Sequence, residues 1–261
     1  MKTKKYIAVF IIAVLSLTLL GCQKEDENSL SRVQSKGELT VVGSGGYPPF
    51  NYMENGEVVG FDVDTGEEIA KRLGVELNYV TSDWDGLIEG LRSSRYDGIL
   101  GSMAITDKRL EVVNFTTPYY YSGAQLIVRK DSEITSASQM KDKTVAVATG
   151  TNFVEDATNL GAEVSYYQDD NSTLLELING RVDGVITDRL VALNSLESIS
   201  GGDQLILVDS LLRLEEMGIA INKNDGELLD KINEILKDMH EDGTLKSISE
   251  KWMNGADITT K

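Results

Sequence analysis

The feature that most constrains the fold is an alternation, from Glu38 onward, of short apolar runs with amphipathic segments of helical period. Strands that alternate with helices along a chain form parallel sheets covered by those helices. The predicted strands are residues 38–43, 76–80, 99–100, 125–129, 144–147, 163–167, 184–187, 205–208 and 217–222. The predicted helices are residues 62–73, 84–91, 152–160, 172–179, 188–195, 227–240 and 245–252. The sequence therefore predicts an α/β protein.

A local pattern occurs twice in this alternation. LRSSRYDGIL contains Asp97 and LINGRVDGVI contains Asp183, and the two aspartates are 86 residues apart. Both segments give a helix end, a small residue, an arginine and Asp-Gly, followed by an apolar strand. One repeat of this length is weak support for an internal repeat. It is nevertheless what two α/β lobes of similar construction would produce.

The first 21 residues have the composition of an export signal. Lys2, Lys4 and Lys5 precede an uncharged stretch of 15 residues, 6–20. A membrane-spanning helix needs about 20 apolar residues, whereas a shorter stretch after basic residues is typical of a secretory signal peptide. We therefore predict that residues 1–21 are a lipoprotein signal peptide.

The end of this stretch, Leu19-Leu20-Gly21-Cys22, resembles the bacterial lipobox, in which the cysteine is lipid-modified and becomes the mature N-terminus. Because Cys22 is the single cysteine of the chain, we expect it to anchor the protein to the membrane. The alternative is an uncleaved signal anchor with an incidental cysteine. Residues 22–37 are polar without apolar periodicity, which predicts a flexible tether.

Composition excludes several classes of function. The chain of 261 residues has 25 basic and 42 acidic residues, a formal net charge of −17. An acidic surface repels nucleic acid, so no nucleic-acid partner is expected. With one cysteine and one histidine, the chain is not expected to form a disulfide framework, a Cys-based zinc site or a His-rich metal site. No metal or other cofactor is therefore predicted.

Short motifs follow one another between Leu39 and Ile258, each weak alone but specific in this order and spacing. They are Tyr47-Pro48-Pro49-Phe50, Gly60-Phe61-Asp62-Val63-Asp64, Trp84-Asp85-Gly86-Leu87-Ile88, Met103-Ala104-Ile105-Thr106-Asp107-Lys108-Arg109, residues 115–119, Gly150-Thr151, Thr187-Asp188 and Asp242-Gly243-Thr244. In these motifs the chain resembles the bacterial extracellular solute-binding proteins of the polar amino-acid class (family 3), which serve ATP-driven uptake transporters.

The resemblance implies a two-lobed periplasmic-binding-protein-like fold (type II), with two α/β lobes joined by two crossing strands and a ligand cleft between them. Lobe 1 would be discontinuous and comprise residues 38–126 and 220–261. Lobe 2 would comprise residues 130–216. The hinges would lie near residues 126–130 and 217–221.

A free amino acid is a zwitterion, so its cleft needs a cation for the carboxylate and an anion for the ammonium. The resemblance places Arg109 on the carboxylate, for which a guanidinium offers two parallel hydrogen bonds. It places Asp188 on the ammonium. Without the resemblance, Arg109 would read as a solvated surface residue and Asp188 as the N-cap of a helix, and the cap and the binding role are compatible.

The remaining site residues also come from the resemblance. Tyr47 and Trp84 are candidates for the cleft walls, with core packing as the alternative for each. Backbone N–H groups of Gly150, Thr151 and Asn152, just before a predicted helix, would contact the carboxylate. Ser102, Met103 and Ala104 complete the list.

The chain departs from the family pattern at three places. Relatives commonly have Thr or Ser at the position of Ala104, and a further Thr or Ser at that of Asn152. Some relatives also have an acid just before the aromatic residue at Tyr47, where this chain has glycine. The last difference favours a neutral ligand, although an acidic partner for a cationic ligand could lie elsewhere.

The function implied by the resemblance is that of a monomeric receptor for a free amino acid, which closes on its ligand and presents it to an ABC permease. A lipid anchor on Cys22 predicts an extracytoplasmic location on the cell membrane. Such receptors are typical of Gram-positive bacteria, although diderm bacteria also make lipoproteins of this kind. No enzymatic activity is expected. Two alternatives are a ligand sensor acting through a membrane partner and a cyclohexadienyl-type dehydratase, for which Glu155 is the nearest candidate acid.

Overall fold

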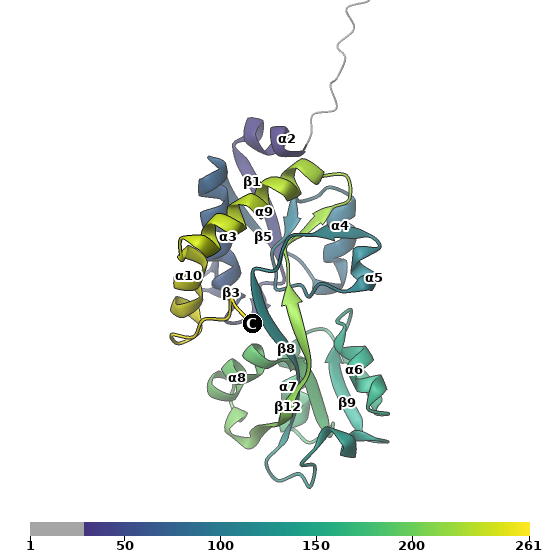
Figure 1. The fold of residues 1–261 in the computed structure, drawn as a ribbon. Helices are drawn as coiled ribbons and strands as arrows, with labels where there is room; N and C mark the ends of the chain where they lie inside the picture. The colour runs from purple at the N-terminus through teal and green to yellow at the C-terminus, as the bar shows by residue number, and fades with distance from the viewer. Residues whose placement is uncertain (1–28) are drawn as a thin grey trace, which may run out of the picture.

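The computed structural model describes residues 29–261 and shows two α/β lobes, one above the other in Figure 1. The upper-lobe sheet has the strand order β5 (Glu76–Thr81), β1 (Glu38–Gly43), β6 (Gly98–Ile99), β13 (Ala220–Asn222) and β7 (Val113–Phe115). The lower-lobe sheet has the order β10 (Glu163–Tyr167), β9 (Thr144–Ala148), β11 (Gly184–Asp188), β8 (Tyr120–Arg129) and β12 (Leu205–Met217). The two lobes confirm the predicted fold class.

Helices cover both sheets, as the alternation of the sequence requires (Figure 1). The upper lobe contains α2 (Ser29–Lys36), α3 (Phe61–Leu73), α4 (Leu87–Arg92), α5 (Asp107–Leu110), α9 (Gly226–Glu241) and α10 (Thr244–Trp252). The lower lobe contains α6 (Phe153–Asn159), α7 (Asp170–Ile178) and α8 (Arg189–Ser198). A third sheet, which the sequence did not predict, consists of β2 (Gly46–Tyr47), β3 (Asn51–Glu54) and β4 (Glu57–Val59). Short 3₁₀ turns span Trp84–Gly86, Ala137–Met140 and Gly202–Gln204.

The repeated Asp-Gly motif has the same structural role in both lobes. The carboxylate of Asp97 accepts a hydrogen bond from the backbone N–H of Thr40 at 2.9 Å, and that of Asp183 accepts one from the N–H of Thr144 at 2.9 Å. Each aspartate thereby ties the turn after a helix to the strand that is second from the edge of its sheet, β1 in one sheet and β9 in the other. The repeat in the sequence corresponds to a repeated structural unit.

The core of the upper lobe contains a group of aromatic rings. Phe50, Phe61, Tyr119 and Tyr120 are fully buried, and the ring centroids of Phe50 and Tyr120 are 4.8 Å apart. Aromatic pairs at such distances contribute about 0.5–1.5 kcal/mol beyond the burial of their area. Gly60 permits this packing, because its φ is 135° and a Cβ atom there would lie 2.1 Å from the carbonyl oxygen of Phe50.

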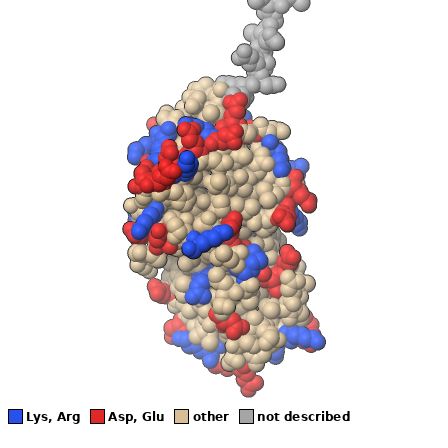
Figure 2. Space-filling model, in the orientation of Figure 1, with Lys and Arg blue, Asp and Glu red and all other residues tan. Residues whose placement is uncertain are grey.

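Charged side chains of both signs lie interspersed over the face seen in Figure 2. Several form ion pairs between elements that are distant in sequence, as Arg72 does with Asp242 and Lys251 with Asp64. Exposed pairs of this kind contribute about 0–1 kcal/mol each. The stability of the lobes therefore comes mainly from their apolar cores.

The chain crosses between the lobes along β8 and β12, which pair antiparallel over the crossing (Figure 1). Tyr120 packs in the upper core, whereas Ala124 packs in the lower core and pairs with Asp188 of β11. The first crossing thus lies between Tyr120 and Ala124, and the prediction of residues 126–130 was too late. Residues 120–129 form one unbroken strand, so nothing in its apolar pattern marks where one lobe ends.

The second crossing is the part of β12 opposite the first. Arg213 pairs with Ala124, and Met217 pairs with Tyr120. This stretch ends where the predicted hinge, residues 217–221, begins. The hinge prediction is therefore displaced toward the upper lobe, where β13 already belongs to the upper sheet.

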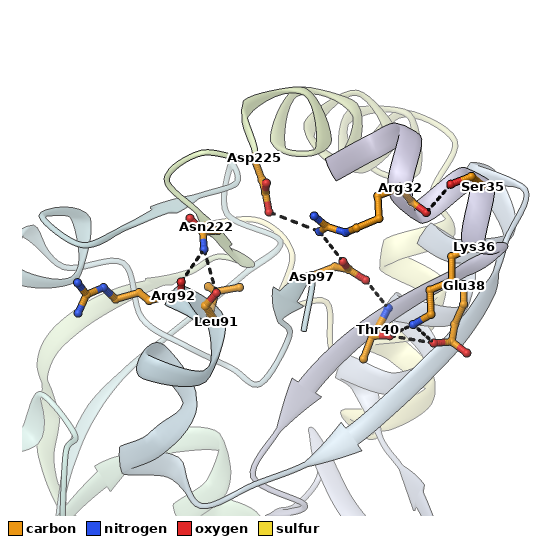
Figure 3. Close-up of polar contacts among 10 residues, drawn as sticks. All are labelled: Arg32, Ser35, Lys36, Glu38, Thr40, Leu91, Arg92, Asp97, Asn222 and Asp225. Atoms are coloured by element: carbon orange, nitrogen blue, oxygen red, sulfur yellow. Dashed lines mark hydrogen bonds and ion pairs between the residues drawn. The ribbon is translucent and has the colours of Figure 1, made fainter. Parts of the chain in front are cut away.

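The prediction of a flexible tether at residues 22–37 is wrong for Ser29–Lys36, which form α2. Val33 on this helix is fully buried in the upper core. Figure 3 shows Arg32 reaching from α2 to Asp97, with Nη2 2.9 Å from Oδ1, while the other oxygen of Asp97 accepts the bond from Thr40. Leu30 packs against the same core from the preceding turn. Two apolar residues and one arginine dock the helix, and so short a pattern is a weak signal in the sequence.

Replacing Arg32 by alanine is expected to lower the free energy of unfolding by about 1 kcal/mol, because it removes a half-exposed ion pair that fixes α2. In a protein of this size the melting temperature should fall by about 2–4 °C, which circular dichroism would detect. Arg92→Ala is the matched control, since the one ion pair that Arg92 forms within residues 29–261 is with exposed Glu89 on its own helix. Equal melting temperatures for the two variants would show that the Arg32 contact does not hold α2.

Within residues 29–261, no helix is both long and apolar enough to span a bilayer. The same part of the chain contains no group of three or more His, Cys, Asp or Glu side chains placed to hold a metal ion. The predicted signal peptide and Cys22 lie outside the described residues.

Candidate functional site

A cavity of about 460 Å³ lies between the two lobes, beside the crossing strands. Its size is in the range of pockets that hold small molecules. The upper lobe contributes Tyr47, Trp84, Ser102, Ala104 and Arg109 to its lining, and the lower lobe contributes Thr151 and Asn152. The first and last lining residues, Ser44 and Met217, are 173 positions apart in sequence, so the cleft joins distant parts of the chain.

Arg109 is the buried cation of this cleft. It lies on α5, which begins after Thr106, whose hydroxyl accepts a hydrogen bond from the backbone N–H of Arg109. The side chain folds back so that Nη1 donates to the carbonyl of Ala104 at 2.8 Å, and the guanidinium carbon lies 5.5 Å from the centre of the Trp84 ring. The residue is 7% exposed, and burial lowers the pKa of Arg109 to about 10. An anion in the cleft would compensate this buried positive charge.

Glu215 is an acidic residue of the cleft that the sequence analysis missed. It lies on β12 within the crossing between the lobes and is 3% exposed. Its Oε1 accepts hydrogen bonds from Asn152 and, at 2.9 Å, from Nη1 of Arg213. Arg213 also donates two hydrogen bonds to Asp156 of α6, from Nε to Oδ1 at 3.2 Å and from Nη2 to Oδ2 at 2.7 Å. Burial by itself would lower the pKa of Arg213, but the hydrogen bonds and negative charges of Asp156 and Glu215 raise this pKa above its ordinary value.

The structure places Asp188 behind the cleft lining rather than in it. The residue is fully buried at the start of α8, where Oδ1 accepts hydrogen bonds from the backbone N–H groups of Leu190 and Val191. Its N-cap role, foreseen from the sequence, is therefore present. Oδ2 is buried without a hydrogen-bond partner among residues 29–261. Burial, with a smaller contribution from the charge of Glu215, raises the pKa of Asp188 to about 7.

A buried polar network supports the loop that carries Ser102 and Ala104. Asp62 at the start of α3 is fully buried and accepts hydrogen bonds from the Tyr119 hydroxyl at 2.6 Å, Asn51 at 2.8 Å and the Ser102 hydroxyl at 2.9 Å. Burial raises the pKa of Asp62 to about 6. The Ser102 hydroxyl is thus directed at Asp62. The backbone of Ser102 at the cleft has a φ of 58°, an unusual value for a residue other than glycine.

In the predicted carboxylate-binding turn, residues 150–152, several hydrogen-bond donors already bind acceptors within the protein. The N–H and the hydroxyl of Thr151 both donate to the carbonyl of Ala148, and the side-chain amide of Asn152 donates to Glu215. Gly150 has a φ of 79° and faces the other lobe, where a Cβ atom would lie 3.4 Å from Asp85. The turn therefore closes against the upper lobe, but Thr151 and Asn152 offer fewer free donors than the sequence suggested.

Three predicted site residues do not line the cavity: Met103, Gly150 and Asp188. Met103 is buried in the core of the upper lobe, against residues such as Leu87 and Leu91. Its side chain follows the apolar side of its loop, which the motif could not reveal. Glu155, the acid considered for a dehydratase, is exposed on α6 and outside the lining of the cavity.

The missed residue, Glu215, does have a signal in the sequence. Two adjacent acids, Glu215 and Glu216, follow the leucine-rich segment 211–214 directly before the predicted hinge. In the structure Glu215 is buried, whereas Glu216 is partly exposed and pairs with Lys261. Strand alternation places these neighbours on opposite faces, but only the tertiary structure shows which of them faces the cleft.

Comparisons with known proteins agree with this geometry. The chain is 36% identical over 257 residues to the L-cystine-binding protein TcyJ of Escherichia coli (strain K12), covering 97% of this chain and 94% of the relative. Among solved structures, a mutant of ArgBP from T. maritima is 37% identical with a TM-score of 0.80, covering 86% of this chain and 99% of the other. The ancestral amino acid-binding protein AncCDT-1, a precursor of cyclohexadienyl dehydratase, is 33% identical with a TM-score of 0.80 and the same coverage.

The family comparison covers most of the described residues. The sequence profile of the bacterial extracellular solute-binding proteins, family 3, matches residues 39–255, from the second residue of β1 to the end of the turn after α10. The match includes both lobes, both crossings and every cleft residue described above. The chain therefore belongs to the bacterial extracellular solute-binding proteins, family 3.

Proposed function

We propose that this protein is the substrate-binding receptor of an ABC importer and binds a free amino acid in the cleft between its lobes. The observation that carries the proposal is a buried arginine, Arg109, in the same interlobe cavity as a buried carboxylate, Glu215, with Asp188 directly behind the wall. The carboxylate of a zwitterion can pair with the arginine, and its ammonium can pair with a carboxylate of the protein. Relatives are named as binding proteins for cystine, arginine or histidine, which supports the same class of ligand.

The proposed mechanism is closure of the lobes about the crossing strands. The ligand carboxylate first binds Arg109 on the upper lobe. The lower lobe then brings its turn at residues 150–152 and the start of α8 toward the ligand, and Asp188 receives the ammonium. Closure is favoured only to the extent that the ligand binds the closed state more tightly than the open one.

Several contacts already join the lobes. Val191 of α8 packs in the upper core, and Gln168 lies 3.5 Å from Asp83 across the cleft. In the closed state, the binding of a ligand would add to these contacts. The closed pair of lobes would then form the surface that an ABC permease recognises, with the chain held at the membrane by lipid on Cys22.

A ligand screen tests the proposal. The mature domain, residues 23–261, would be refolded to remove any bound ligand and melted in the presence of each amino acid, cystine and several organic acids. A ligand present at 100 times its Kd should stabilise the protein by about 2.7 kcal/mol, which gives a clear rise in melting temperature. Stabilisation by organic acids alone, with no amino acid active, would contradict the proposal.

Transport and sensing are separated by a second measurement. If the protein serves an importer, deletion of its gene should abolish high-affinity uptake of the ligand identified in the screen. Full uptake in the deletion strain, together with specific binding by the pure protein, would instead support a sensor that acts through a membrane partner.

A further inference from the structure

One oxygen of the Glu215 carboxylate has no partner. Oε1 is held by Asn152 and Arg213, but Oε2 is buried and accepts no hydrogen bond among residues 29–261. The side chain is 1% exposed and borders the cavity. Leaving a buried charged oxygen unpaired is costly, so this atom is a natural acceptor for a donor that arrives in the cleft.

The surroundings fix this carboxylate in place. Arg213 bridges Glu215 to Asp156 on α6, and Asn152 at the N-terminal end of the same helix donates to Oε1. The glutamate is thereby held by the crossing strand and by the lower lobe at once. A preorganised acceptor of this kind loses little conformational entropy when it binds a ligand.

The charges around the cleft call for more than one positive group on the ligand. Arg109 is the buried cation available for a carboxylate, whereas Arg213 is already matched by Asp156. Asp188 and Glu215 each have one buried oxygen without a partner. A ligand with a single ammonium would leave one of these two oxygens without a hydrogen-bond donor in the closed cleft, whereas a ligand with two cationic groups would supply a donor to both.

We propose that Glu215 is a specificity-determining residue that binds a second cationic group, so the ligand is an amino acid with a side-chain ammonium or guanidinium or a second amino group. This inference rests on the proposed function, because it assigns Arg109 and Asp188 to the α-carboxylate and the α-ammonium. The chain lacks the acid that some relatives have just before Tyr47, and this difference favoured a neutral ligand. Glu215 supplies an acid at another position of the cleft.

The test uses ligands that differ only in the second charge. L-arginine is compared with its neutral analogue L-citrulline, and L-lysine with L-norleucine, by isothermal titration calorimetry on the refolded mature domain. We expect the wild-type protein to bind at least one of the charged ligands at least 10-fold more tightly than its neutral partner. Glu215→Gln, which keeps the size of the side chain, should reduce that preference to less than about 3-fold.

Glu216→Gln is the matched control, because Glu216 is the adjacent acid but pairs with Lys261 away from the cleft. It should keep the full preference for the charged ligand. Circular dichroism would verify that both variants fold, and Glu215→Asp would show whether a displaced carboxylate restores part of the preference.

The inference is overturned if citrulline and norleucine bind the wild-type protein as tightly as arginine and lysine, or if Glu215→Gln weakens charged and neutral ligands equally. Either result leaves the proposed function intact, because amino acids still bind. If no amino acid, charged or neutral, binds the wild-type protein, the proposed function fails as well.

Discussion

Arg109→Ala is expected to weaken amino-acid binding by roughly 30-fold to several thousand-fold. Truncating one partner of a buried, hydrogen-bonded charge pair costs about 2–5 kcal/mol, much of which is the penalty of leaving the other charge unpaired. Arg109 is 7% exposed, and its Nη1 is the donor to Ala104, which leaves its other N–H groups without a partner among residues 29–261. Calorimetry with the ligand identified by the thermal screen measures the effect.

Two controls make this result specific. Arg109→Lys keeps the charge but loses the two parallel hydrogen bonds, so an intermediate loss is expected. Arg92→Ala removes an exposed arginine of the same lobe and should bind normally. Because burial already disfavours the charge of Arg109, the alanine variant should remain folded without ligand. Normal binding by Arg109→Ala would place the carboxylate site elsewhere.

Asp188→Asn is expected to stabilise the unliganded protein at pH 8 by up to about 4 kcal/mol, which is the shift in pKa of about three units converted to free energy, and to weaken ligand binding. The pKa of Asp188 is raised by burial to about 7, whereas an aspartate in the unfolded chain has a pKa of about 3.9. Ionising this residue in the folded state therefore costs stability, and asparagine removes that cost. Asparagine is also a good N-cap, so the hydrogen bonds to the start of α8 are retained.

The sign of the pH dependence follows from the same shift. Between about pH 4 and 7 the folded protein holds a proton on Asp188 that the unfolded chain has lost, so this residue makes stability fall as pH rises, by about 1.4 kcal/mol per unit. The asparagine variant should lack this contribution. Asp62, whose pKa burial raises to about 6, adds a slope of the same sign in both proteins.

Urea unfolding of both proteins at several pH values between 4 and 8 measures this difference. The two free energies of unfolding should converge near pH 4 and diverge as pH rises. A constant difference across the range would mean that Asp188 does not titrate with a raised pKa. Binding gives an independent readout: if Asp188 must ionise to accept an ammonium, wild-type affinity should fall below pH 7.

Local sequence patterns predict most of the helices and strands of the fold. The predicted strands at residues 38–43 and 163–167 coincide with β1 and β10, and the helix predicted at residues 62–73 is one residue shorter than α3. These elements have clear periodicity and clear ends, such as Gly74 after α3, which takes the left-handed conformation of a helix stop. For these elements the local pattern is therefore sufficient to predict both the type of element and its approximate bounds.

Elements that depend on partners distant in sequence were missed. The strands of the small sheet have two to four residues each, too few for a period to show. Strand β12 extends nine residues beyond its predicted end because it pairs with β8 across the crossing, and α2 forms because Val33 and Arg32 find partners on the upper lobe. Tertiary contacts override weak local preference in each case.

The sequence alone determined the α/β alternation, the internal repeat around Asp97 and Asp183, and, through motif order, the family and Arg109 as a candidate ligand residue. Only the tertiary structure decided which acids surround the cleft: Asp188 is not among the residues of its lining, whereas Glu215 and Asp170 are buried acids that border it. The physical reason is that periodicity reports which face of an element a side chain occupies. Whether that face meets a core or a cavity depends on the element packed against it.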